Sequence, residues 1–132
     1  MTVKTERLKN ILLIDDDAAV AESLQLILQR SGLTVQTVSN GKLGLRWLEK
    51  HPVDLVITDI YMDVMDGIET VAAVKKRFPR IKIIAMSGGS HVVGMDSLPM
   101  AKLLGADRTI TKPADIPKLL EIIVELDKEL GG

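Results

Sequence analysis

Short apolar runs alternate with stretches of helical periodicity along the chain. The pattern predicts five strands, at 10–15, 33–38, 53–59, 81–86 and 107–111. Between and after them, apolar residues recur at the spacing of amphipathic helices, first at Val20, Leu24, Ile27 and Leu28. Helices are expected to stop at Gly32, at Gly105 and at the pair Phe78–Pro79. Strands that alternate with helices indicate βα units, hence an α/β fold with a parallel sheet and right-handed crossovers.

Strand composition predicts the order of the strands in this sheet. The runs 11–14, 55–57 and 83–85 are continuously apolar, as is typical of parallel strands that are buried on both faces. The second predicted strand alternates and the fifth is mostly polar, so these two suit the sheet edges. The doubly wound order 2-1-3-4-5 meets both conditions, although other orders with the same edges remain open. It places a topological switch point between the first and third strands.

Composition and charge restrict the class of protein. A chain of 132 residues with 46% hydrophobic residues and a net charge of −1 predicts one globular domain rather than a disordered chain. The sequence contains no cysteine, so disulfides are excluded, and no apolar run is long enough to span a bilayer. The near-neutral balance gives no electrostatic reason to expect nucleic acid as a partner. We therefore expect a cytoplasmic domain with no membrane or nucleic-acid partner.

Polar residues stand where the predicted strands end. In open α/β sheets, ligands bind in the crevice beyond the carboxyl ends of the strands. If the first and third strands are neighbours, carboxylates from both converge there, and Asp17 is expected to cap the helix that follows. The residues concerned, in strand order, are Asp15, Asp16 and Asp17 after the first strand, Asp59 at the end of the third, Ser87 after the fourth and Lys112 after the fifth.

This combination of residue types suits phosphoryl transfer to a carboxylate. Converging carboxylates repel one another unless a positive charge joins them, and Mg²⁺ prefers such oxygen ligands. Lys112 adds a charge suited to a phosphate, and Ser87 adds a hydroxyl. The main-chain N–H groups of Gly88 and Gly89 can approach an anion closely. Taken singly, most of these residues also have an ordinary structural explanation, but Asp59 ends a strongly apolar strand, where an unpaired charge is costly. Their joint placement favours a site.

Four ordered motifs resemble the receiver domain of two-component response regulators, from about Lys9 to Leu130. The resemblance implies a flavodoxin-like (βα)₅ fold with residues 1–132 as a single receiver domain. The motifs are Ile-Leu-Leu-Ile-Asp-Asp-Asp at 11–17, Asp-Leu-Val-Ile-Thr-Asp-Ile-Tyr-Met-Asp-Val-Met-Asp-Gly at 54–67, Ile-Ile-Ala-Met-Ser-Gly at 83–88, and Leu-Gly-Ala-Asp with Thr-Lys-Pro between 104 and 113.

The same resemblance implies a role for each site residue. Asp59 would accept a phosphoryl group from a sensor histidine kinase or a histidine phosphotransfer protein. A downstream protein target or an output domain would then respond, and a homodimer is a further expectation. Mg²⁺ would be bound by Asp16, Asp59 and the main-chain carbonyl of Tyr61, with Asp15 acting through water. Ser87 would supply a switch hydroxyl. Lys112, which precedes Pro113, would pair with Asp59 or with its phosphate.

This chain departs from the common family pattern in four places. Asp63 stands where a proline is usual, Thr109 stands where a switch tyrosine or phenylalanine is common, and Ala114 replaces a frequent phenylalanine. The stretch 87–105 is also longer than is typical, and we expect a loop through Asp96 and a short helix from about Ser97. Movement of a switch aromatic residue is therefore not assumed for this chain.

Two alternatives are weighed against a phosphorylatable receiver. A phosphatase of the haloacid-dehalogenase type would use Asp15 as its nucleophile, but the chain is short, has no cap insertion and lacks a second acidic pair near its C-terminal end. A receiver-like interaction module would never accept phosphate, which the missing switch aromatic allows but the acids, hydroxyl and lysine disfavour. A phosphodonor experiment separates these possibilities.

Overall fold

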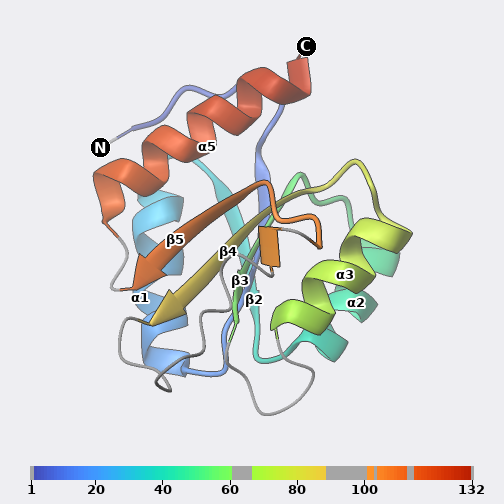
Figure 1. Ribbon diagram of the computed structural model, residues 1–132. Helices are drawn as coiled ribbons and strands as arrows, with labels where there is room; N and C mark the ends of the chain where they lie inside the picture. The colour runs from blue at the N-terminus through green and yellow to red at the C-terminus, as the bar shows by residue number, and fades with distance from the viewer. Residues whose placement is uncertain (1, 61–66, 89–100, 103, 113–114, 132) are drawn as a thin grey trace.

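The protein is a five-stranded parallel sheet with helices on both faces (Figure 1). The computed structural model describes residues 2–60, 67–88, 101–102, 104–112 and 115–131. The elements run in the order β1 Asn10–Ile14, α1 Ala18–Arg30, β2 Thr34–Val38, α2 Gly41–Lys50, β3 Leu55–Asp59, α3 Gly67–Arg77, β4 Lys82–Gly88, β5 Arg108–Lys112 and α5 Ile116–Gly131.

The strand order is β2-β1-β3-β4-β5, as the composition of the strands predicts. All four ladders are parallel, and β1 lies between β2 and β3 with Ile14 opposite both Val38 and Thr58. Strand β3 is buried along its whole length, whereas β2 is exposed at alternate positions. The apolar content of each strand therefore follows its place in the sheet, because central strands are covered on both faces.

Two apolar layers hold the helices against the sheet. Helices α1 and α5 pack on one face through a cluster that contains Leu24 and Ile123, and α2 and α3 pack on the other through Leu48 and Val74 (Figure 1). None of the helices in the described part of the chain is long and apolar enough to cross a bilayer.

The helical periodicity is confirmed with one error in α1. The buried face of this helix consists of Ala21, Leu24 and Leu28, whereas Val20 is 37% exposed. Val20 occupies the first turn of the helix. Gly32 and Gly105 have φ values of 101° and 125°, as helix-ending glycines do.

Two strand ends lie further along the chain than the sequence predicts. Strand β4 extends to Gly88 and β5 to Lys112, because Ser87 lies opposite Thr111 and Gly88 lies opposite Lys112 in the ladder. Ser87 and Lys112 therefore belong to the ends of the strands instead of following them. Strand β3 begins two residues later than expected, at Leu55. Of the short helix expected from about Ser97, only Ala101 and Lys102 are described, and both are helical.

Candidate phosphoryl-acceptor and metal site

Three carboxylates meet where β1 and β3 end. The parallel register of β1 and β3 pairs Ile14 with Thr58, so Asp15 and Asp59 leave the sheet side by side. Carboxylate oxygens of Asp15, Asp16 and Asp59 all lie within 4.8 Å of one another. Asp15 is 2% exposed and Asp59 is 7% exposed, whereas Asp16 is open to solvent. The convergence that the sequence predicts is therefore confirmed for these residues.

The loop after β1 fixes the orientation of the first carboxylate. The main-chain N–H of Asp15 donates to the carbonyl oxygen of Val38 at 3.1 Å, which continues the ladder with β2 by one residue. Its Oδ1 accepts a hydrogen bond from the N–H of Asp17 at 3.0 Å. Asp17 itself caps α1, because its side chain accepts from the N–H groups of Ala19 and Val20. Asp17 is thus structural, as expected, and only its two neighbours join the cluster.

Hydrogen bonds with β4 and with Thr58 hold the main chain at Asp59 and Ile60. Its Cα lies opposite that of Met86, and the N–H of Ile60 donates to the Met86 carbonyl oxygen at 2.9 Å. The buried hydroxyl of Thr58 donates to the carbonyl oxygen of Asp59 at 3.0 Å. Neither Thr58 nor Gly67, whose N–H donates to the Ile60 carbonyl oxygen at 2.8 Å, receives a role from the sequence.

Ser87 and Lys112 lie on the two strands beyond Asp59. Ser87 is 1% exposed and directly follows Met86, the residue opposite Asp59. The row that contains Asp59 and Met86 continues to Ile110 on β5, so the main chain of Lys112 lies two residues beyond that row. The side chain of Lys112 lies outside the described residues. Other expectations that fall outside them concern Tyr61, Asp63, Gly89, Pro113 and Ala114.

The donor set of the acidic cluster fits a hard divalent cation. Carboxylate oxygens are ligands that Mg²⁺ prefers, at about 2.0–2.1 Å, and the ion usually keeps several waters. Oxygens on opposite sides of one such ion are about 4 Å apart, so carboxylate oxygens that lie within 4.8 Å of one another can reach a single ion. Asp15, Asp16 and Asp59 could therefore hold a metal ion together.

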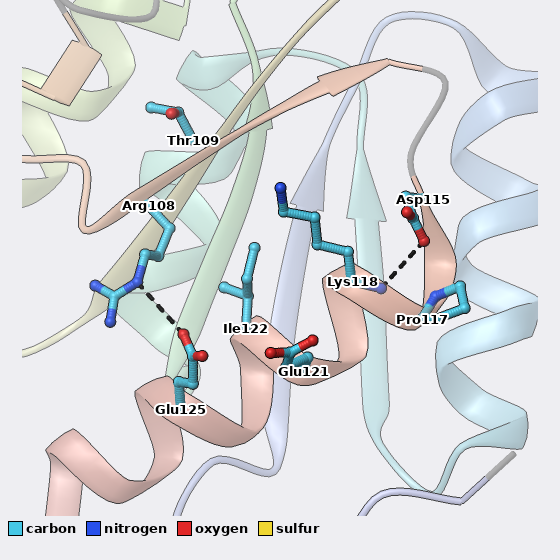
Figure 2. A pocket seen from close by; sticks show the side chains of 8 residues that line it. All are labelled: Arg108, Thr109, Asp115, Pro117, Lys118, Glu121, Ile122 and Glu125. Atoms are coloured by element: carbon cyan, nitrogen blue, oxygen red, sulfur yellow. Dashed lines mark hydrogen bonds and ion pairs between the residues drawn. The ribbon is translucent and has the colours of Figure 1, made fainter.

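Two hollows lie beside the sheet, and they differ in the residues that line them. One, of about 260 Å³, lies against the acidic cluster and is lined by Asp15, Asp16 and Glu22 together with residues of β2 and the loop after it. The other, of about 550 Å³, lies between β5 and α5 and includes Thr109 (Figure 2). Asp115 accepts from the N–H of Lys118 at 3.2 Å at its rim, where α5 begins.

Comparison with known proteins is consistent with this geometry. The family described as the response regulator receiver domain matches residues 11–124. The chain is 34% identical over 114 residues to the transcriptional regulatory protein GlrR of Escherichia coli, covering 86% of this chain and 25% of that protein. It is 33% identical to PhoP of Bacillus subtilis, a regulator of alkaline phosphatase synthesis, covering 80% of this chain and 42% of that protein. The chain thus spans between a quarter and a half of these relatives.

The fold also matches that of a solved receiver domain over nearly the whole chain. The CheY-like response regulator receiver domain protein of Methanospirillum hungatei superposes with a TM-score of 0.85 at 31% identity, covering 94% of this chain and 97% of the other.

Proposed function

This chain belongs to the response regulator receiver domain family of two-component systems, and we propose that its Asp59 is the residue that accepts the phosphoryl group. The donor would be a phosphohistidine of a sensor histidine kinase or of a histidine phosphotransfer protein. The observation that carries the proposal is the convergence of three carboxylate groups within 4.8 Å, with the buried Asp59 among them. We also propose that residues 1–132 form one receiver domain.

The proposed metal ligands are Asp16, Asp59 and the main-chain carbonyl of Tyr61, with Asp15 acting through a bridging water. When bound, Mg²⁺ supplies positive charge that offsets the charges of the carboxylates and the phosphoryl group. Asp15 is held for this role by the N–H of Asp17. Asp16 is exposed and can adjust to the ion without strain on the core.

The proposed transfer breaks one bond and forms one. A carboxylate oxygen of Asp59 attacks phosphorus in line, the O–P bond forms, the N–P bond of the phosphohistidine breaks, and the imidazole leaves. The hydroxyl of Ser87, the N–H of Gly88 and the ammonium of Lys112 are proposed to donate to phosphoryl oxygens. Ser87 is the last but one residue of β4, the strand next to Asp59, which supports that role. In this proposal the domain assists its own phosphorylation and dephosphorylation and catalyses no other reaction.

The new phosphate changes what the surface can bind. A phosphoryl group adds charge and acceptor oxygens, so contacts from Ser87 and its neighbours form only in the phosphorylated state. Contacts that exist in only one state shift a two-state equilibrium by their difference in free energy. We propose that a downstream protein or an attached output domain reads this shift.

Intact-mass measurement with a small phosphodonor tests the proposal. Incubation with acetyl phosphate and Mg²⁺ is expected to add one phosphoryl group to the wild type and to Asp54→Asn, and none to Asp59→Asn. Asp54 is the matched control because it lies at the opposite end of β3, where it accepts from main-chain N–H groups. A wild type that stays unmodified, or an Asp59→Asn variant that is modified equally, contradicts the proposal. Turnover of a phosphate ester that depends on Asp15 but not on Asp59 would instead indicate a phosphatase.

A further inference from the structure

The first residue of α3 lies against the main chain of Asp59. Gly67 donates its N–H to the carbonyl oxygen of Ile60 at 2.8 Å, which fixes the start of the helix to the end of β3. A Cβ atom built on Gly67 would lie 2.2 Å from the carbonyl oxygen of Asp59 and 2.5 Å from the Cα of Ile60. Both distances are far inside van der Waals contact, so a side chain at this position requires the main chain to move.

The crowding at Gly67 differs from that at another glycine of the same fold. A Cβ on Gly44 would meet the Cδ1 atom of Ile14 at 2.6 Å, but that atom ends a side chain that can rotate away. At Gly67 the opposing atoms belong to the peptide that joins Asp59 to Ile60. No change of rotamer relieves the contact there.

The strand side of this contact is also held in place. The N–H of Ile60 donates to the Met86 carbonyl oxygen at 2.9 Å, and the hydroxyl of Thr58 donates to the Asp59 carbonyl oxygen at 3.0 Å. Thr58 is fully buried, and so are its neighbours in β3. The Asp59–Ile60 peptide is therefore fixed by β4 and Thr58 and is covered by Gly67 at the start of α3.

We infer that Gly67 and Thr58 are positioning residues for the phosphoacceptor: together they fix the main chain from which the Asp59 carboxylate projects. This inference rests on the proposed function, since it concerns the same carboxylate. Reacting and ligating groups must be held within about 0.5 Å of their working geometry, and a displacement of about 1 Å can lower a rate roughly a hundredfold. A methyl group at residue 67 displaces the main chain at the base of the acidic cluster.

The test compares Gly67→Ala with Gly105→Ala. The control also replaces a crowded glycine, since a Cβ on Gly105 would meet Cγ of Lys75 at 2.4 Å, and its φ of +125° strains an alanine. It differs in position, because Gly105 lies before β5, at the end of the sheet opposite the acids. Both variants are expected to lose stability in urea. Only Gly67→Ala is expected to weaken Mg²⁺ binding, at least tenfold by calorimetry, and to slow phosphorylation by acetyl phosphate at saturating Mg²⁺.

A second variant decides the matter if Gly67→Ala does not fold. Thr58→Val keeps the branched shape and removes only the hydroxyl that donates to Asp59. Its Mg²⁺ affinity is expected to fall two- to fivefold with the fold intact. If the wild type binds Mg²⁺ and is phosphorylated, and the folded variants match it, the positioning role is overturned while the proposed function stands. A wild type that does neither overturns the proposed function, and this inference with it.

Discussion

Among the described residues, three aspartates meet at the carboxyl ends of the strands and three others lie near the amino ends, and the two groups differ in their partners. At the carboxyl ends, Asp15, Asp16 and Asp59 bring their carboxylates within 4.8 Å of one another. At the amino ends, each aspartate accepts hydrogen bonds from main-chain N–H groups of a segment that is distant in the sequence. The aspartates of this second group are Asp54, Asp107 and Asp127.

The amino-end aspartates join segments that are distant in the sequence. Asp54 accepts from the N–H groups of Lys9 and Asn10 at 3.0 and 2.9 Å, which ties the start of β3 to the start of β1. Asp127 of α5 accepts from residues 6, 7 and 8 and so fastens the segment before β1 to the last helix.

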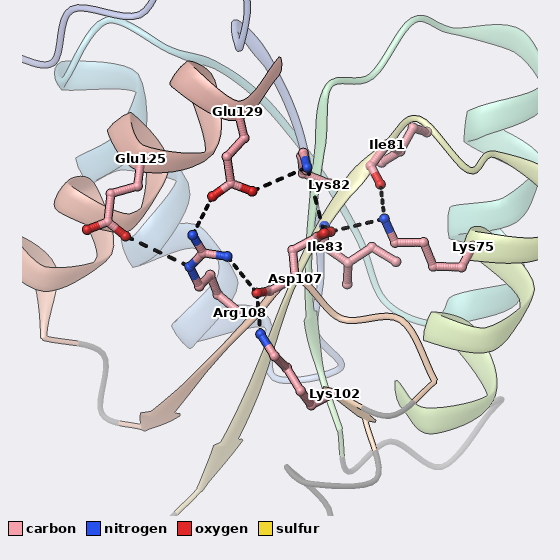
Figure 3. Close-up of polar contacts among 9 residues, drawn as sticks. All are labelled: Lys75, Ile81, Lys82, Ile83, Lys102, Asp107, Arg108, Glu125 and Glu129. Carbon is pink, nitrogen blue, oxygen red and sulfur yellow. Dashed lines mark hydrogen bonds and ion pairs between the residues drawn. The ribbon is translucent and has the colours of Figure 1, made fainter. Parts of the chain in front are cut away.

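The third amino-end aspartate lies in a network of charges (Figure 3). Asp107 accepts from the N–H of Ile83 at 2.8 Å and pairs with Lys75 of α3 at 3.0 Å. Nearby, Glu129 of α5 pairs with Arg108 and with Lys82. These contacts connect α3, β4, β5 and α5 at the amino ends of the strands.

The difference teaches how to separate a structural carboxylate from a functional one. The first N–H groups of parallel strands are donors, so an aspartate at the amino ends finds partners within the fold. Carboxyl ends present carbonyl oxygens, which cannot donate. Acids gathered there repel one another, and a cation from solution lowers that repulsion. Removing an amino-end aspartate should therefore lower the stability of the fold. Removing a carboxyl-end aspartate should instead weaken ion binding.

The largest expected effect is on the carboxyl-end cluster. Asp16→Asn removes one of the proposed direct ligands and is expected to weaken Mg²⁺ binding about a hundredfold, or about 2.8 kcal/mol. Because the change also removes a repelling charge, the free energy of unfolding without Mg²⁺ should not fall. Calorimetric titration and urea unfolding measure the two quantities. If Asp16→Asn kept its Mg²⁺ affinity and had a lower free energy of unfolding, Asp16 would act like an amino-end aspartate and the comparison would be wrong.

The opposite result is expected for Asp127. Asp127→Ala leaves the buried N–H of Leu8 and the partly buried N–H groups of residues 6 and 7 without their acceptor, which is expected to lower the free energy of unfolding by about 1–3 kcal/mol. Mg²⁺ affinity should stay within twofold of the wild type. Urea unfolding at pH 7 measures the loss; a variant as stable as the wild type would show that this acceptor is not needed.

The contribution of Asp127 should also depend on pH. Burial raises the pKa of this carboxyl, but the hydrogen bonds from the N–H groups of Glu6, Leu8 and Arg7 together lower it by more. The pKa therefore lies below the ordinary value of 3.8. A carboxyl with a lowered folded-state pKa stabilises the fold above its unfolded-state pKa and loses that effect as the pH falls through the folded-state value. The stability difference between the wild type and Asp127→Ala should be constant from pH 7 to about pH 5 and shrink below about pH 4. A difference that grows on acidification would mean the opposite sign of shift.

The smallest effect is expected at the exposed edge of the charge network. The hydrogen bond from Arg108 lowers the pKa of Glu129, but the Glu129 side chain is 39% exposed. Exposed ion pairs contribute about 0–1 kcal/mol and are screened by salt. Glu129→Gln is thus expected to cost less than about 1 kcal/mol in urea unfolding, and less still in 1 M NaCl. A loss as large as that of Asp127→Ala would show that the network acts as a unit.

Much of the architecture is predictable because it depends on local pattern. The continuous apolar runs of β1, β3 and β4 identify the central strands, and the polar composition of β2 and β5 identifies the edges. Once the order 2-1-3-4-5 follows, Asp15, Asp16 and Asp59 must come together, since parallel neighbours end at the same side.

Contacts between distant segments could not be predicted in this way. Nothing in the spacing of Asp54, Asp107 and Asp127 distinguishes them from the acids of the cluster. Their roles depend on which N–H groups the tertiary structure brings within about 3 Å, across separations of up to 121 residues. Gly67 is similar: the sequence shows a glycine before a helix, and only the packing of α3 on β3 brings it against the Asp59 carbonyl.

The sequence by itself determined the layered fold, which strands are central and which lie at the edges, and the acids that stand where strands end, because alternation and burial leave their mark on neighbouring residues. Tertiary structure alone decided which aspartates accept from distant main-chain N–H groups, which residues hold the main chain of Asp59, and how β4 and β5 extend through Ser87 and Lys112. Those features depend on angstrom-scale approach between elements, and hydrophobic patterning carries no information at that scale.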